Sequence, residues 1–182
     1  MRPGLLDPHL RAACFGGDQR AMAATEFALV LPLMVALLLG GIEVSDAVSL
    51  GRKVTLTAHT VTDLVTQNSC LSTSEMNTII GATSAIVAPY SNANLTMTVS
   101  EIDTNANSNA TIGWSTSSTL TPGTVVTLPS ALQQPNAHYI WGVATYSYQP
   151  TLGYKLTGTI NITDQMYLSP RLSTTITYPA SG

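Results

Sequence analysis

Residues 21–42 read AMAATEFALVLPLMVALLLGGI, an apolar run with one charged side chain, that of Glu26. Its length is close to the roughly 20 residues that a helix needs to cross the hydrocarbon core of a bilayer. We therefore expect a transmembrane helix over residues 22–42. A carboxylate at membrane depth costs on the order of a few kcal/mol unless it is paired. Glu26 is therefore expected either to lie at the headgroup boundary or to have a cationic partner.

The charges on either side of the run indicate its orientation. Three arginines precede it, the last of them Arg20, whereas the first charged residues after it are Glu43 and Asp46. Because positively charged flanks tend to stay in the cytoplasm, residues 1–21 are predicted to be a cytoplasmic leader. The bulk of the chain is then predicted to lie outside.

A second periodic pattern follows the apolar run without a break. Its apolar residues recur at three- and four-residue steps, the spacing of an amphipathic helix. We expect a helical extension over residues 43–67, so that one helix runs from Met22 to Gln67. The predicted apolar stripe consists of Val44, Ala47, Val48, Leu50, Val54, Thr57, Ala58, Val61, Leu64 and Val65.

The composition narrows the classes of function. Only 9% of the 182 residues are charged, against about 25% in an average soluble domain, and Thr, Ser and Asn are abundant instead. Such a surface is typical of extracytoplasmic and fibre-forming proteins. The net charge of −3 and the lack of a Lys/Arg cluster argue against nucleic-acid binding. Cys14 and Cys70 flank the apolar run, so we expect no disulfide between them.

Residues 70–182 have the pattern of an exported periplasmic or extracellular domain. Ser72 and Glu75 form a capping-box pattern, and apolar residues at helical spacing predict a helix over 73–88, ended by Pro89. Beyond it the apolar period changes to two, as in strands. We expect an α+β fold: a long amino-terminal helix, one further helix and an antiparallel sheet. The expected strands lie near 95–99 and at 112–115, 124–128, 139–148, 155–168 and 171–178.

The segment 20–32, together with Gly-Ile-Glu at 41–43, resembles the amino-terminal signature of TadE/TadG-like proteins. These are pseudopilins of the tight-adherence, Flp-type type IV pilus system. The resemblance covers residues 20–65, and Phe27 and Pro32 are signature positions of its helix. It implies a structural or assembly component of a pilus that mediates surface attachment. The implied setting is the inner membrane, with other pilins, pseudopilins and the pilus assembly machinery as partners.

The resemblance also implies that a prepilin peptidase cuts between Ala21 and Met22, which leaves Glu26 as the fifth residue of the mature chain. The family usually has glycine where this chain has Ala21. In pilins the glutamate pairs with the terminal amine of a neighbouring subunit, which makes Glu26 a subunit-pairing carboxylate. Two other interpretations stay open. Residues 1–47 also fit a secretory signal peptide, and the run also fits an uncleaved anchor.

The sequence predicts no catalytic, cofactor-binding or metal site. Its three histidines lie far apart along the chain, and no zinc or nucleophile motif accompanies them. His59 and Asp63 are four residues apart, a spacing that fits a pair of metal ligands but is more typical of an exposed helical contact. We therefore expect neither an enzyme nor a small-molecule substrate.

An aromatic stripe is the remaining feature of the exported domain. On a strand, Tyr139, Trp141 and Val143 share one face, and Ile140 lies on the other. Core packing is the first interpretation, and an adhesive or subunit-contact face is the second. The stripe consists of Trp114, Tyr139, Trp141, Tyr146 and Tyr148.

The sequence thus leaves two functions, a pilus-associated pseudopilin and a single-pass, membrane-anchored exported binding module.

Overall fold

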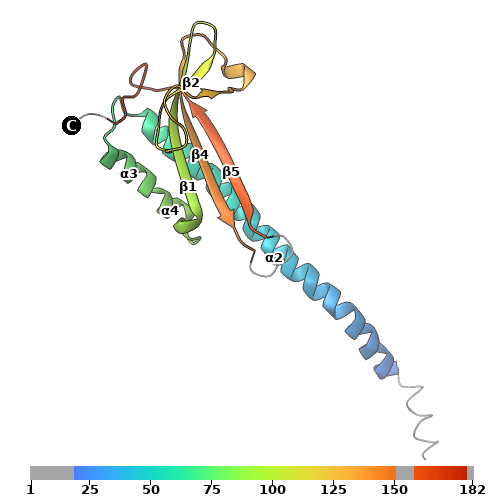
Figure 1. Ribbon diagram of the computed structural model, residues 1–182. Coiled ribbons are helices and arrows are strands. Elements are labelled where there is room, and N and C mark those ends of the chain that lie inside the picture. The colour runs from blue at the N-terminus through green and yellow to red at the C-terminus, as the bar shows by residue number, and fades with distance from the viewer. Residues whose placement is uncertain (1–18, 151–157, 180–182) are drawn as a thin grey trace, which may run out of the picture. The chain divides into compact units, whose positions relative to one another are not determined.

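The protein, seen in a computed structural model, is described over residues 19–150 and 158–179. It divides into two compact units, Met1–Val44 and Ser45–Gly182. The helix α2 (Gln19–Thr66) contributes residues to both units. The helices α3 (Thr73–Gly81) and α4 (Thr83–Val87) follow, and then the strands (Figure 1). These are β1 (Leu95–Thr104), β2 (Ala110–Ser115), β3 (Val125–Val126), β4 (His138–Tyr148) and β5 (Ile160–Leu168), with the short 3-10 helices η1 (Asn92–Asn94) and η2 (Ser130–Leu132) in the connections.

The five strands form one antiparallel sheet in the order β3-β2-β1-β4-β5. The long strands β1 and β4 are therefore central, and β5 forms one edge. A long amino-terminal helix, a further helical segment and an antiparallel sheet make an α+β fold, which confirms the predicted fold class.

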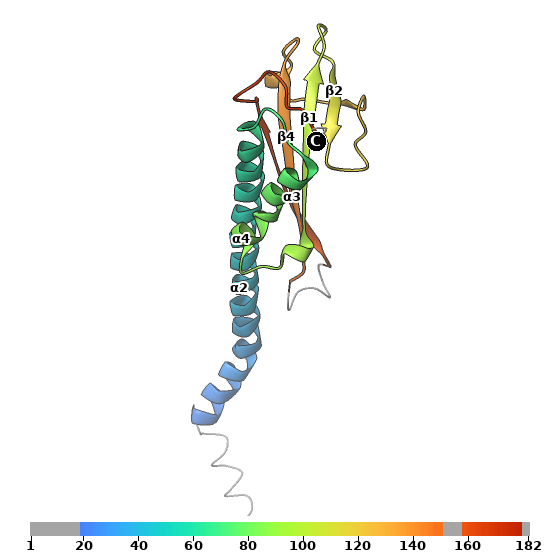
Figure 2. The same ribbon diagram turned by 90° about the vertical axis from the view of Figure 1, so that its left-hand side faces the viewer.

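In the unit Ser45–Gly182, the carboxyl-terminal part of α2 covers one face of the sheet. Leu50, Val54 and Ala58 are buried against Ala144 and Tyr146 of β4. One to two turns later on α2, Val61 and Val65 are buried in a second cluster. This cluster also contains residues of α3, β1, β2 and β4 and of the segment 169–179, called the carboxyl-terminal segment below. Figure 2 shows α3 and α4 beside this part of α2 on the same face of the sheet. Burial of the stripe therefore explains why this stretch of helix forms.

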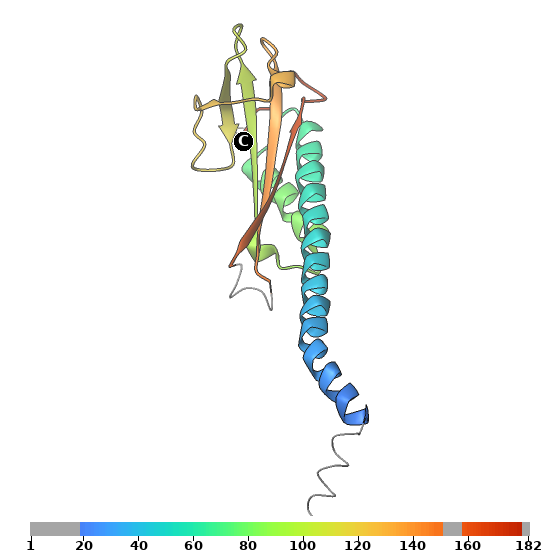
Figure 3. The same cartoon turned by 90° about the vertical axis from the view of Figure 1, so that its right-hand side faces the viewer.

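The edge strand β5 also lies along α2 (Figure 3). The hydroxyl of Thr55 on α2 donates a hydrogen bond to the carboxylate of Asp164 on β5. A methyl group of Ile162 lies 3.9 Å from the position that a Cβ at Gly51 would occupy. The helix thus contacts both β4 and β5.

The opposite face of the sheet is divided in two. At one end Ile102, Ala110 and Ile112 are buried with Leu128 of the β3–β4 connection and with Tyr139. Further along this face, two cross-strand pairs between β4 and β5 are polar. Thr145 and Thr163 lie 3.0 Å apart at their hydroxyl oxygens, and the hydroxyl of Ser147 donates to Oδ1 of Asn161 at 3.1 Å.

The predictions for the helices need two corrections, one to a helix boundary and one to the buried stripe of α2. The helix expected over 73–88 is two helices, because α3 ends at Gly81 and α4 begins at Thr83. Its start is as predicted, since Ser72 and Glu75 form a complete capping box. On α2, Val44 and Val48 are 64% and 52% exposed. The buried stripe is thus narrower than predicted, and it begins at Leu50.

The strand predictions also need correction. The segment 171–178 makes one isolated bridge, between Cys70 and Thr177, in place of a strand. The run predicted at 124–128 pairs only at Val125 and Val126, since Pro129 follows closely and cannot donate to a ladder. The strand predicted over 155–168 is observed from Ile160, while residues 155–157 lie outside the described part of the chain.

Candidate functional site

The first candidate site is the apolar run. Every side chain from Met22 to Ile42 is exposed in the single chain. Within the described residues, α2 is the helix that is long and apolar enough to cross a membrane. Contiguous apolar surface of this extent marks contact with lipid or with other proteins. The run therefore presents an apolar surface that lipid or another protein can cover.

The predicted signature residues all lie on this part of α2. Glu26 is exposed, Phe27 is 60% exposed, and Pro32 lies inside the helix without ending it. Before the proline, the hydroxyl of Thr25 donates to the carbonyl of Met22 at 2.8 Å. The side chain of Ala21 and the leader residues 1–18 lie outside the described part of the chain.

The second candidate site is a cluster of ionisable side chains at one end of β1 and β4. Asp103 and His138 are directly opposite each other in the antiparallel pair, and Nδ1 of His138 lies 2.6 Å from Oδ1 of Asp103. Glu101 lies two residues before Asp103, on the same face of β1. One ligand atom from each of the three residues lies within 4.8 Å of the others.

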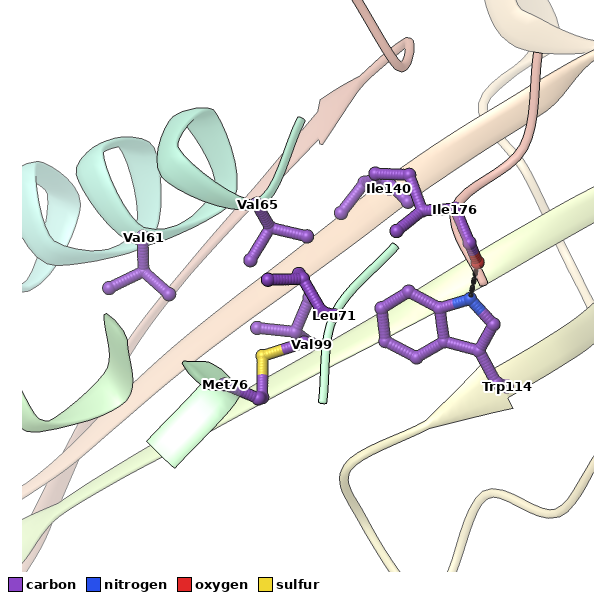
Figure 4. Packing of buried hydrophobic residues seen from close by; sticks show 8 residues of the cluster. All are labelled: Val61, Val65, Leu71, Met76, Val99, Trp114, Ile140 and Ile176. Carbon is purple, nitrogen blue, oxygen red and sulfur yellow. Dashed lines mark hydrogen bonds between the residues drawn. The ribbon is translucent and has the colours of Figure 1, made fainter. Parts of the chain in front are cut away.

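Glu101 is buried, with 4% of its surface exposed. Its Oε1 accepts a hydrogen bond from the backbone N–H of Ile176 at 3.0 Å. The indole N–H of Trp114, which is the cross-strand partner of Glu101, donates to the carbonyl of Ile176 at 2.6 Å (Figure 4). Side chains of β1 and β2 thus bind both backbone polar groups of Ile176 and hold the carboxyl-terminal segment against the core.

Burial raises the pKa of the Glu101 carboxyl, and the nearby charge of Asp103 raises it further. The hydrogen bond from Ile176 acts in the opposite direction and lowers this pKa. The net direction is upward because removing a carboxylate from water disfavours its charged form. Glu101 is therefore a carboxyl group in a low-dielectric position, with a second carboxylate and an imidazole beside it.

The sequence pattern does not connect these three residues. The three histidines lie far apart along the chain, whereas His138 meets the carboxylate of Asp103 on another strand. The sequence does contain one indication of the cluster: Glu101 and Asp103 are two residues apart on a strand that is otherwise rich in Thr and apolar residues, so both carboxylates lie on one face. Their meeting with His138 depends on the pairing of β1 with β4, which the sequence pattern leaves open.

The predicted contact between His59 and Asp63 is replaced by other partners. The guanidinium of Arg171 forms an ion pair with Asp63, and Nε2 of Gln67 donates to the same carboxylate at 2.8 Å. Arg171 also donates its backbone N–H to the carbonyl of Thr66 at 3.0 Å. Asp63 therefore helps to attach the carboxyl-terminal segment to the end of α2.

The aromatic stripe is mostly core. Trp114, Tyr139 and Tyr146 are buried, with 7%, 6% and 4% of their surfaces exposed. Trp141 is half-buried, and its ring stacks on that of Tyr167 with the ring centres 5.9 Å apart. The first interpretation, core packing, is confirmed for the three buried rings.

Comparison with known proteins gives a family match over part of α2. Residues 21–62 match the family model described as TadE-like protein. No curated protein and no solved structure matches the chain. The matched residues contain the exposed apolar run and most of the α2 stripe that packs on the sheet. TadE-like proteins are a pilus-associated family, and residues 21–62 of this chain match its model.

Proposed function

We propose that this protein is a TadE/TadG-like pseudopilin, a structural or assembly component of a tight-adherence type IV pilus that takes part in surface attachment. The observation that supports this most is the exposed run from Met22 to Ile42 inside the TadE-like segment. A helix that leaves all of this surface uncovered needs lipid before assembly. It can exchange lipid for neighbouring helices afterwards.

The proposal includes a topology. Residues 22–42 cross the bacterial inner membrane once, with the leader 1–21 in the cytoplasm and the domain 70–182 in the periplasm. A prepilin peptidase cuts between Ala21 and Met22 on the cytoplasmic side. Glu26 then pairs with the terminal amine of another pilin or pseudopilin, because a carboxylate in hydrocarbon needs a cationic partner.

The function is tested by deleting the gene and counting surface fibres by electron microscopy, with attachment to a surface measured in parallel. We expect both to be lost and to be restored when the full chain is supplied again. Unchanged fibres together with lost attachment would instead favour a membrane-anchored binding module that acts outside the pilus. Unchanged fibres and unchanged attachment would contradict both functions.

The topology gives a separate prediction through Cys70, which is a free and exposed cysteine. In a Cys14→Ala variant, a membrane-impermeant maleimide should label Cys70 in spheroplasts without lysis, because the domain faces outward. A variant that also carries Cys70→Ala is the blank. Labelling that requires lysis would place the domain in the cytoplasm and contradict the proposed orientation.

A further inference from the structure

The cluster of Glu101, Asp103 and His138 brings together more negative charge than its surroundings balance. Two carboxylates and one imidazole present ligand atoms within 4.8 Å of one another. Among the residues that the structure describes, no lysine or arginine forms an ion pair with either carboxylate. The ion pair within the cluster is that between His138 and Asp103.

The burial of Glu101 makes this imbalance costly. A carboxylate taken out of water needs a countercharge as well as hydrogen bonds, and the backbone N–H of Ile176 supplies a hydrogen bond without a full charge. A cation held between the carboxylates would supply the missing charge. The cluster is also accessible, since the side chains of His138 and Asp103 are 24% and 39% exposed.

The backbone fixes the position of each group. Asp103 and His138 are paired across two central strands, and the carboxylate of Asp103 lies over Gly113 of β2. A Cβ at Gly113 would lie only 2.5 Å from Oδ2 of Asp103, so glycine leaves the space that this carboxylate occupies. Rigid strands with locked side chains are favourable supports for a ligand set.

We propose that Glu101, Asp103 and His138 bind a divalent cation of the Zn²⁺ type, with water completing its coordination. One imidazole and two carboxylates are donors that Zn²⁺ accepts, and three protein ligands with water as the fourth are a common arrangement for it. Bonds of about 2.0–2.2 Å place tetrahedral donors roughly 3.4 Å apart. The ion therefore separates His138 from Asp103 slightly and draws the Glu101 carboxylate inward, movements of about an ångström for these side chains.

The test is calorimetric titration of the full chain in detergent with ZnCl₂, and with CoCl₂ followed by its visible absorption. We expect one bound ion per chain. Glu101→Gln and His138→Gln should each weaken binding by about tenfold or more, because each replaces a strong zinc ligand by a neutral amide, which binds Zn²⁺ weakly. The matched control is His59→Ala, which removes an exposed histidine on α2 outside the cluster and should leave the affinity unchanged.

Glu101→Gln keeps an oxygen that can accept the bond from Ile176, so this variant is expected to fold, and its circular dichroism spectrum and thermal midpoint without metal check this. The proposal is overturned if the folded wild-type chain binds neither Zn²⁺ nor Co²⁺. It is equally overturned if His59→Ala abolishes binding while the two cluster variants retain it. Binding of Ca²⁺ or Mg²⁺ in place of Zn²⁺ would also contradict it, because those ions select oxygen ligands.

Discussion

Replacing Gly142 by alanine lowers the thermal unfolding midpoint of the full chain in detergent by several degrees. Gly142 is a point where β4 approaches α2 closely. A Cβ there would lie 1.8 Å from the hydroxyl oxygen of Thr62 and 3.1 Å from its Cβ. The side chain of Thr62 cannot move away without a cost in free energy, because it is fully buried and its hydroxyl donates to the carbonyl of Ala58 at 2.6 Å.

The size of this effect follows from overpacking. An extra methyl group in a well-packed core costs about 1–3 kcal/mol, and each kcal/mol lowers the midpoint by about 3–4 °C in a domain of this size. The larger side chain of Gly142→Val should cost more. Circular dichroism during heating measures the midpoint, and an unchanged midpoint for Gly142→Ala would contradict the close packing of helix on strand.

Two control variants separate the contact from a general effect of alanine. Nothing lies within 4 Å of the position that a Cβ at Gly81 would occupy, so Gly81→Ala should leave the midpoint unchanged or raise it slightly. Thr62→Ala removes the oxygen that a new Cβ would meet. The double variant with Gly142→Ala should therefore be less destabilised than the sum of the two single changes, which is the signature of direct coupling.

Removing the charge of Glu26 should abolish fibre assembly while leaving the chain in the membrane. In the proposed mature protein the carboxylate meets the amine of a neighbouring subunit within an apolar environment. Loss of one partner from a buried ion pair costs about 3–5 kcal/mol, which shifts the assembly equilibrium by roughly a hundredfold or more. Glu26→Leu and Glu26→Gln should both show the loss, as counted by electron microscopy of surface fibres.

Three comparisons make this experiment specific. Asp46→Asn removes another exposed carboxylate of α2 beyond the apolar run and should assemble normally. Glu26→Asp keeps the charge and should retain part of the assembly. The intact mass of the membrane-bound protein shows whether it begins at Met22, so that a failure of processing is distinguished from a failure of pairing. Normal fibres from Glu26→Leu would remove the main support for the pseudopilin proposal.

Features that depend on local pattern could be predicted from the sequence. A long apolar run must form a helix in lipid because its backbone groups can be satisfied only within the segment. The capping box at Ser72 and Glu75 acts over three residues, and it is present as predicted. The alternation along β4 also decides which side chains share a face, since successive residues of a strand point to opposite sides.

Features that depend on pairing between distant segments emerge only in the folded chain. The sheet order places His138 opposite Asp103, and the register of β4 against α2 brings Gly142 onto Thr62. The carboxyl-terminal segment has the pattern of a strand, yet Glu101 and Trp114 bind its backbone at Ile176, so it makes side-chain bonds in place of a ladder. Local periodicity fixes neither strand order nor register, because both are set by the total packing of the core. The sequence by itself therefore determines the apolar run, whereas the cluster of Glu101, Asp103 and His138 forms only when the strands pair.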